Sequence, residues 1–469
     1  MTRHRGFALL GALVGVVALV CGAIIAGYGL LENGLSTASG TASGPGTGRG
    51  SPADGSRDAR TQGRTPVGRA APASADAWTG TWAAAPAGAE PSAPIGHPGR
   101  SIRNVVHTSI GGTSVRITLS NLYSPSALLI GRASVAVGQG SRGSQGVQGR
   151  LGSRGGASSA EAVAGTMRQL TFGRGPAVTL PPGGQITSDP VPLRVPYGGD
   201  LLVTLYTPTP SGPVTYHPHA LQTSYLATGD RTQDLDGAAY TEPTTVWRYL
   251  TAVDVLNREA RGAIVTFGDS ITDGLRSSQD ANRRWPDILA ARLRDQHIGV
   301  LNEGISGNRV LWDAAGHGNG ASGVARFRRD VLGRAGVKTV VIDLGINDIL
   351  RSGETDPARI TAGLTELTRQ AQARGVRVIG STLTPFGAHR GYNAVTESVR
   401  DQVNEEIRSG RVFDDVVDFD RALRDPYAPD RLRPVYDSGD GLHPSDAGYR
   451  AMGRYLDLQA LDDKAPAQL

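Results

Sequence analysis

The residue best placed for chemistry is a serine that follows a buried strand. Ser270 lies in the sequence GDSITDG, residues 268–274, directly after the apolar run 263–267. A serine hydroxyl is a poor nucleophile until a neighbouring base takes its proton, and a histidine oriented by a carboxylate is the usual base. Asp440 and His443, three residues apart in DGLH, supply those two side chains. These residue types predict acyl transfer, with Ser270 as nucleophile, His443 as base and Asp440 fixing the imidazole tautomer.

Two further segments contain the donors that acyl transfer needs. A tetrahedral intermediate carries negative charge on an oxyanion, which preorganised hydrogen-bond donors must meet. Gly307 lies in GISGN, residues 304–308, and Asn347 lies in GIND, residues 345–348. Glycine lets the backbone approach a substrate closely, and the asparagine carboxamide donates without carrying a charge. Both segments are therefore candidates for stabilising the oxyanion.

The elements that must position these residues follow a regular alternation after residue 261. Compact apolar runs of the kind buried in parallel sheets are separated by segments of helical period. One helical segment opens with the cap Asp356-Pro357 and closes at Gly375. Strand and helix in alternation predict a doubly wound α/β sheet, whose ligands bind outside the carboxyl ends of the strands. The predicted strands are residues 263–267, 298–301, 339–344, 376–381 and 416–419, with helices predicted at 285–293, 355–375 and 395–410.

Taken together, four ordered blocks resemble the SGNH, or GDSL, hydrolase superfamily. The blocks are GDS at 268–270, Gly307, GIND at 345–348 and DGLH at 440–443. The resemblance implies a flavodoxin-like doubly wound parallel sheet over residues 258–469. It also implies a triad of Ser270, His443 and Asp440, and an oxyanion hole formed by the backbone N–H groups of Ser270 and Gly307 and the side chain of Asn347.

Two longer stretches narrow this resemblance. The sequences ISGNR at 305–309 and HPSDAGY at 443–449 are similar to a two-domain bacterial branch of the superfamily. That branch carries an N-terminal β-domain, and its members are described as acylhydrolases or arylesterases. No GxSxG nucleophile elbow is present in the sequence, so the α/β-hydrolase alternative loses its main support.

Each motif also has an ordinary structural interpretation. A serine or aspartate after a strand often caps a helix, and asparagine and aspartate in loops often bond to nearby backbone. The four motifs in their expected order favour catalysis for the triad and the oxyanion hole. For Asp269 and Asp348 we instead expect capping and local turn bonding.

The residues before the α/β segment predict a β-domain. Residues 115–120 and 201–205 alternate apolar and polar side chains, and glycine and proline turn signals punctuate the region. This pattern favours a β-sandwich domain over residues 78–257. The Gly/Ser-rich stretch 138–165 predicts a surface loop.

The N-terminus carries a membrane signal. Arg3 and Arg5 precede an uncharged run over residues 6–31, which is long enough to span a bilayer as a helix. The positive-inside rule places residues 1–5 in the cytoplasm and the rest of the chain outside. A transmembrane anchor is the favoured interpretation, and a cleaved signal segment that leaves a secreted protein is the alternative. Residues 32–77 have the composition of a disordered linker.

Composition excludes several classes of function. The 469-residue chain has a formal net charge of +5 and no basic block, which argues against a nucleic-acid partner. Its one cysteine, Cys21, lies in the N-terminal apolar run, so the folded part has neither a thiolate nucleophile nor cysteine ligands for zinc. His217 and His219 share a face if that segment is extended, but we favour surface or interdomain packing for them over a metal site. We expect no metal and no organic cofactor.

These observations predict an extracytoplasmic serine esterase or acylhydrolase that works through an acyl-enzyme. Its expected substrates are small-molecule or polysaccharide-borne esters, such as acylated carbohydrates or aryl esters. The alternatives are a lipase or phospholipase acting on lipid esters, a non-catalytic glycan-binding surface protein, and a structural surface protein. The pattern does not predict an oligomeric state.

Overall fold

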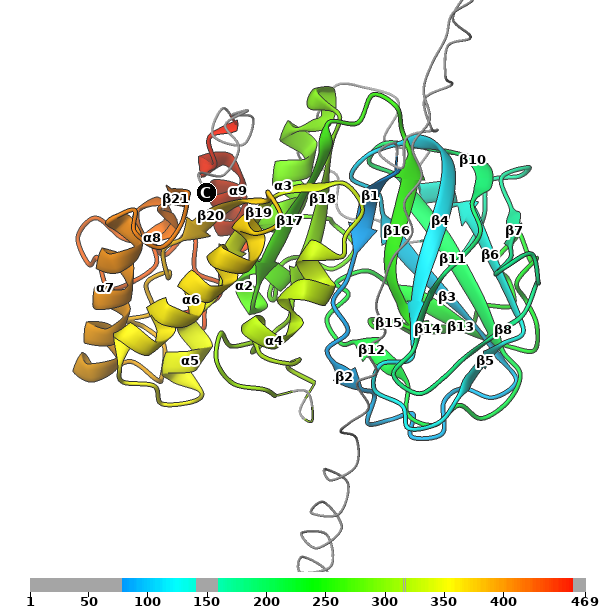
Figure 1. Cartoon of the computed structure of the whole chain (residues 1–469), viewed down its shortest axis with the longest axis horizontal. Coiled ribbons are helices and arrows are strands. Elements are labelled where there is room, and N and C mark those ends of the chain that lie inside the picture. The colour runs from blue at the N-terminus through cyan, green and yellow to red at the C-terminus, as the bar shows by residue number, and fades with distance from the viewer. Residues whose placement is uncertain (1–77, 141–158, 315, 317, 459–469) are drawn as a thin grey trace, which may run out of the picture. The chain divides into compact units, whose positions relative to one another are not determined.

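The computed structural model of the chain describes residues 78–140, 159–314, 316 and 318–458 (Figure 1). The N-terminal segments expected over residues 1–77 lie outside the described residues, as does most of the loop expected at 138–165. Within the described ranges, no helix combines the length and apolar character that a membrane crossing requires.

The described strands within residues 78–256 form two larger antiparallel sheets that share one hydrophobic core. Val115, Ile117 and Leu119 of one sheet pack in the same cluster as Leu201, Val203 and Leu205 of the other. These apolar residues recur with a period of two in the sequence, and that pattern was the basis for predicting strands here. The side chains that face the core are therefore those expected from the sequence. The region is therefore β-rich, as expected.

The first sheet has the strand order β1-β16-β4-β10, with β9 also paired to β4, and the second has the order β14-β13-β3-β11-β6-β7. Smaller sheets pair β15-β12-β2 and β5-β8. The strands are β1 Trp78–Ala83, β2 Gly88–Ala89, β3 Arg100–His107, β4 Gly112–Ser120, β5 Leu128–Ile130, β6 Arg132–Val137, β7 Arg168–Leu170, β8 Val178–Leu180, β9 Gln185–Thr187, β10 Val191–Val195, β11 Asp200–Thr207, β12 Thr215–His217, β13 Ser224–Thr228, β14 Glu242–Thr244, β15 Trp247–Arg248 and β16 Leu250–Leu256.

A parallel sheet follows, and it confirms the predicted doubly wound α/β architecture. Its strand order is β18-β17-β19-β20-β21, and every neighbouring pair is parallel. Counted along the chain this is the order 2-1-3-4-5 of flavodoxin-like sheets. Each strand overlaps one of the predicted apolar runs. The strands are β17 Gly262–Gly268, β18 Ile298–Gly304, β19 Val337–Asp343, β20 Arg377–Ser381 and β21 Asp415–Val417.

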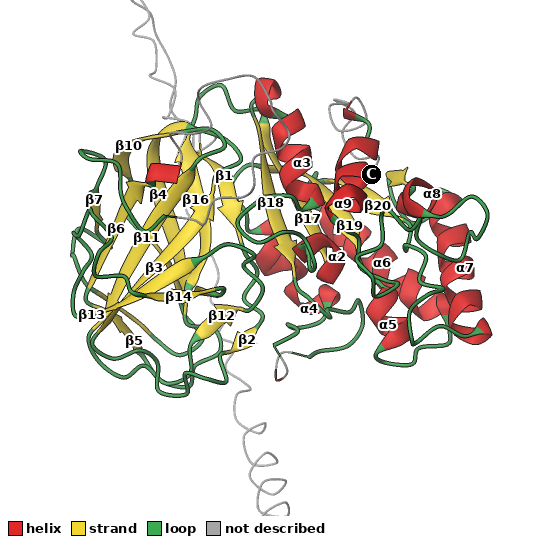
Figure 2. Cartoon of the chain, turned by 180° about the vertical axis from the view of Figure 1, so that it is seen from behind, coloured by secondary structure: helices red, strands yellow, loops and turns green. Residues whose placement is uncertain are grey.

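Helices cover both faces of this sheet because alternate strand residues point to opposite sides. On one face, Val265 and Val340 pack with Leu364 of α6 and Val403 of α7. Figure 2 shows α3 and α9 over the opposite face, where their side chains pack against Ile264. The helices are α2 Ser270–Asp273, α3 Trp285–Arg292, η3 Arg294–Gln296, α4 Gly323–Phe327, η5 Arg328–Leu332, α5 Ile346–Leu350, α6 Pro357–Gln372, α7 Ala394–Arg408, α8 Phe419–Leu423 and α9 Asp446–Tyr455.

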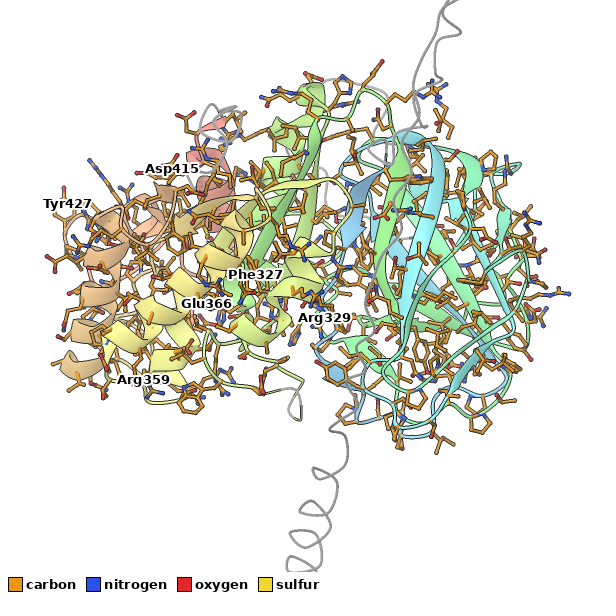
Figure 3. All side chains as sticks on the ribbon, in the orientation of Figure 1. Phe327, Arg329, Arg359, Glu366, Asp415 and Tyr427 are labelled. Atoms are coloured by element: carbon orange, nitrogen blue, oxygen red, sulfur yellow. The ribbon has the colours of Figure 1, made fainter. Side chains whose placement is uncertain are left out.

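Local signals explain where the main helices begin. The Asp356 side chain accepts a hydrogen bond from the backbone N–H of Ala358, and Pro357 occupies the first turn of α6, as predicted. Helix α9 was not predicted, although Ser445 caps it by accepting from the backbone N–H of Gly448. In the core, Phe327, which is labelled in Figure 3, packs edge-on against Phe267 with ring centroids 5.3 Å apart.

The topology fixes where a ligand can bind. In a 2-1-3-4-5 sheet the chain direction of the connections reverses between the first and third strands, which here are β17 and β19. The loops after these two strands lead to opposite faces of the sheet, and ligands of such sheets bind where these loops diverge. Ser270 follows β17 and Asn347 follows β19, so both lie at this topological switch point.

Shortening a core side chain of α6 tests this packing. Leu364 is 1% exposed in the cluster beneath the sheet, so Leu364→Ala should lower the free energy of unfolding by about 2–5 kcal/mol. The control is Thr365→Ala on the exposed side of the same helix, with an expected change within about 0.5 kcal/mol. Urea unfolding measures both. Equal losses in the two variants would show that α6 does not pack as described.

Candidate active site

Ser270 lies at the first turn of α2, immediately after β17. Asp269 caps this helix by accepting from the backbone N–H of Ile271, and Gly274 ends it with a left-handed backbone, φ 93°. Gly268 leaves no space for a side chain, since a Cβ there would lie 2.3 Å from Thr272 Oγ1 and 2.5 Å from the Asp343 carbonyl oxygen. The strand and the helix therefore meet in a tight turn that positions the Ser270 hydroxyl.

The structure brings Asp440, His443 and Ser270 into one hydrogen-bonded series. His443 Nε2 lies 2.8 Å from Ser270 Oγ, and His443 Nδ1 lies 2.8 Å from Asp440 Oδ2. The other carboxylate oxygen of Asp440 accepts from the backbone N–H groups of His443 and Leu442. These bonds fix the Nδ1–H tautomer and leave Nε2 free to accept the serine proton.

The electrostatics suit a base that is neutral near pH 7. Burial lowers the pKa of His443 below its ordinary value of 6.5, and the Asp440 carboxylate only partly offsets this. Burial opposes ionisation of Asp440 too, but the hydrogen bonds from His443 and Leu442 outweigh it and lower the pKa of Asp440 to about 2. The pair therefore holds a negative carboxylate beside a neutral imidazole.

Asn347 presents an unsatisfied donor. Its Nδ2 atom is buried and has no hydrogen-bond partner in the part of the chain that the structure describes. The amide does lie near enough to Asp269 to oppose the raised pKa of that carboxyl, but the two groups do not meet in hydrogen-bonding geometry. A buried donor without an acceptor is costly, and in native proteins it often marks a functional role.

The loop after β18 presents a second donor. Gly307 is buried in a left-handed conformation, φ 78°, and a Cβ there would lie 2.6 Å from Asn319 Nδ2. No acceptor among the described residues receives a hydrogen bond from the backbone N–H of Gly307 or of Ser270. The three groups expected to form the oxyanion hole thus donate to no acceptor among the described residues. Asn308 is different, because its carboxamide bonds to the backbone at Asn319 and Ala321.

Arg351 was missed by the sequence analysis. Its Nε donates to Asn347 Oδ1 at 3.0 Å, and a Cβ on Gly307 would lie 3.4 Å from its guanidinium carbon. By engaging the oxygen, Arg351 determines that Nδ2 is the free end of the carboxamide. The spacing of four residues along α5 was the available signal, since such pairs are neighbours on a helix.

The two aspartates for which capping or turn bonding was expected behave differently. Asp269 caps α2 as predicted, and burial together with the nearby Asp343 charge raises its pKa well above the ordinary value. Asp348 bonds to its own backbone N–H, which agrees with the local bonding expected, but it also has distant partners. Its carboxylate accepts from the backbone N–H groups of Val310 and Leu311, which are 38 and 37 residues away, so it ties the loop after β18 to α5.

His217 and His219 of the β-rich region have different surroundings. His217 is buried and contacts Asp273 of α2, which agrees with the interdomain packing favoured for it. His219 is half-buried beside it. Among the described residues, no three His, Cys, Asp or Glu side chains are grouped so as to hold a metal ion.

The segment of the chain that contains the site matches a known protein family. Residues 266–451 match the model of the GDSL-like Lipase/Acylhydrolase family, a range that includes the five residues of the expected triad and oxyanion hole. No curated protein matches the chain.

Several solved structures are similar to part of the chain. An aryl esterase from M. smegmatis is 20% identical with a TM-score of 0.35, covering 43% of this chain and 99% of that one. A carbohydrate acetylesterase from Sinorhizobium meliloti is 18% identical with a TM-score of 0.35, again covering 43% and 99%. A GDSL-like lipase from Bacteroides thetaiotaomicron is 20% identical with a TM-score of 0.32, covering 43% and 88%.

The electrostatic role of Asp440 can be measured directly. Asp440→Asn should lower the pKa of His443 further, because the charge that stabilises the imidazolium is removed. NMR titration of the His443 ring protons in both proteins gives the two values. The control is Asp446→Asn, since Asp446 bonds to Ser278 and Arg283 and not to His443, and it should leave the titration unchanged. A higher pKa in Asp440→Asn than in the wild type would contradict the assignment.

Proposed function

We infer a two-step ester hydrolysis at Ser270. The match of residues 266–451 to the GDSL-like lipase/acylhydrolase family supports a serine ester hydrolase. The observation that carries this proposal is the unbroken series of contacts from Asp440 through His443 to Ser270, with both imidazole nitrogens engaged at 2.8 Å. A serine hydroxyl that contacts a histidine oriented by a carboxylate is the arrangement that activates serine as a nucleophile.

In the first step, Ser270 Oγ attacks the ester carbonyl carbon while His443 Nε2 takes the hydroxyl proton. Asp440 stabilises the resulting imidazolium through Nδ1 and remains ionised. When the tetrahedral intermediate collapses, the bond to the alcohol oxygen breaks, and His443 returns the proton to that oxygen. The acyl group is now esterified to Ser270, and the alcohol leaves.

In the second step, water attacks the acyl-enzyme with His443 again as the base. Collapse of the second tetrahedral intermediate returns the proton to Ser270 Oγ and releases the carboxylic acid. In both steps the oxyanion accepts hydrogen bonds from the backbone N–H groups of Ser270 and Gly307 and from Asn347 Nδ2. These donors have no acceptor among the described residues, so they need not break other bonds when charge develops.

For the substrate, we propose an ester with a polar or aromatic alcohol, such as an acylated carbohydrate or an aryl ester. The side chains close to the triad are polar and cationic. Arg276 lies 3.4 Å from Asp440 and is 60% exposed, and Arg351 and His389 are near enough to influence or sense the charge of His443. Such surroundings favour hydroxyl-rich or aromatic groups over the long acyl chain of a lipid.

For the location, we propose that the reaction takes place outside the cytoplasm. The support is the uncharged run 6–31 after two arginines, followed by a linker of small and polar residues. A membrane anchor at this segment would keep the enzyme near ester groups of the cell surface, and cleavage of the segment would release it.

Replacement of the nucleophile tests the reaction. Ser270→Ala should remain folded and lose hydrolysis of every ester in a panel of aryl acetate, acetylated oligosaccharide and long-chain esters, because no other group can form the acyl-enzyme. The wild type should prefer the first two by more than about tenfold in kcat/KM, or about 1.4 kcal/mol. A lipid esterase would show the reverse preference.

The matched control is Ser277→Ala, which removes a buried hydroxyl that has no hydrogen-bond partner within the described ranges. It should keep wild-type activity. A fluorophosphonate should label the wild type and Ser277→Ala but not Ser270→Ala, and a chain that labels nowhere would instead be a binding protein. Near-native activity of folded Ser270→Ala would falsify the mechanism.

Removal of one oxyanion donor should have a large effect on turnover alone. Asn347→Ala should lower kcat by about 10²–10³ while the protein stays folded, because the lost bond is made chiefly in the transition state. Steady-state kinetics measure kcat and KM, and a thermal melt shows whether the variant stays folded. If KM rose and kcat were unchanged, Asn347 would bind the ground state and the assignment would be wrong.

A further inference from the structure

His217 of the β-rich region has both ring nitrogens bonded to acceptors. Nδ1 lies 2.9 Å from the Ala85 carbonyl oxygen, and Nε2 lies 3.0 Å from Asp273 Oδ1. A neutral imidazole carries only one N–H, so two acceptors require the doubly protonated ring. The side chain is 4% exposed and lies beside the Trp247 ring. His217 is thus a buried cation at the end of β12.

Its partner, Asp273, belongs to the helix that begins at the nucleophile. Asp273 is the last residue of α2 and is 2% exposed. While Oδ1 faces His217, Oδ2 accepts from the backbone N–H of Ser306 at 2.9 Å and from the Ser306 hydroxyl at 2.6 Å. One buried carboxylate therefore joins the β-rich region, α2 and the loop after β18.

Ser306 immediately precedes Gly307, whose backbone N–H is assigned to the oxyanion hole. The Ser306 carbonyl is held from the other side by Asn319 Nδ2 at 2.6 Å. The peptide that carries the Gly307 N–H is the one whose carbonyl belongs to Ser306, so both bonds restrain the direction of that N–H. Of the two restraints, the one through Asp273 depends on a residue outside the α/β part.

The charges around this contact favour the ionic form of both partners. Burial alone lowers the pKa of His217, but Asp273 and the Ala85 carbonyl outweigh it and raise the pKa above its ordinary value. Burial raises the pKa of Asp273, but His217, His219 and Ser306 together hold it below its ordinary value.

Two further titratable side chains lie near the pair. Buried Arg284 is paired with Asp287, and the Tyr449 phenol stays neutral because burial raises its pKa well above the ordinary value. His217 is thus the cation that bonds directly to Asp273. Breaking a buried pair by removing one partner leaves an uncompensated charge. Without His217, the Asp273 carboxylate must shift toward water or take up a proton.

We propose that His217 is a positioning residue of the esterase: by holding the Asp273 carboxylate against Ser306, it fixes the Gly307 backbone N–H in the oxyanion hole. This inference rests on the proposed function of Gly307. It makes the β-rich region part of the catalytic scaffold. The expected loss on removing His217 is in transition-state stabilisation, because substrate in the ground state makes little use of the oxyanion donors.

The test compares His217→Gln with His107→Gln in the full chain. His107 also forms a histidine–aspartate contact, 2.8 Å to Asp200, but its partner belongs to the β-rich region. With an aryl acetate as substrate, His217→Gln should lower kcat about 10- to 100-fold with KM changed less than about twofold. His107→Gln should keep kcat within about twofold of the wild type. Equal kcat values in the two variants would overturn the proposal.

A double-mutant cycle with Ser306→Ala separates positioning from general stability. If His217 acts through Asp273 and Ser306, the double variant should lose clearly less kcat than the product of the two single losses. Independent, multiplicative losses would overturn the proposal. Should His217→Gln fail to fold, Ser306→Ala alone carries the test, with an expected loss in kcat of about tenfold; wild-type kcat in that variant would refute the connection.

Failure of the inference about His217 can be distinguished from failure of the proposed function. An active Ser270→Ala variant removes the esterase mechanism itself. An inactive Ser270→Ala variant together with fully active His217→Gln removes only the role of His217.

Discussion

The carboxyl ends of five parallel strands meet at one edge of a sheet, and the divergence of the loops after β17 and β19 is the constraint on which the site depends. Ser270 and Asn347 follow these two strands, and Gly307 follows β18, the neighbour of β17. His443 arrives from the far end of the chain, on the segment just before α9. Each group comes from a different connection, so the register of the strands determines the distances between them.

Below this edge of the sheet, buried hydrogen bonds hold the backbone of the connecting segments in place. Asp348 holds the backbone of Val310 and Leu311, and Arg326, fully buried, donates to the carbonyl oxygens of Gly268 and Glu303. These bonds join the segments after β17, β18 and β19 into one network. Such networks gain strength from the low dielectric of the interior, but they lose it sharply when one member is missing.

Much of this could be predicted from the sequence, because the information is local. Apolar runs located all five strands of the parallel sheet, and Ser270, Gly307, Asn347, Asp440 and His443 stand in short motifs at strand ends or in loops. The contact of His217 with Asp273 could not be predicted, since it joins residues 56 apart through the packing of two regions. The distant bonds of Asp348 could not be predicted for a related reason. The spacing in the sequence indicated a local bond, but the folded chain also brings two backbone N–H groups of a distant loop to this carboxylate.

The unsatisfied donors at Ser270, Gly307 and Asn347 have a consequence for evolution of the chain. Buried donors without protein acceptors lower the stability of the native state. Substitutions that satisfied them internally would raise the melting temperature, yet under the proposed mechanism they would take the place of the oxyanion. Selection for stability and selection for turnover therefore oppose each other at these three positions.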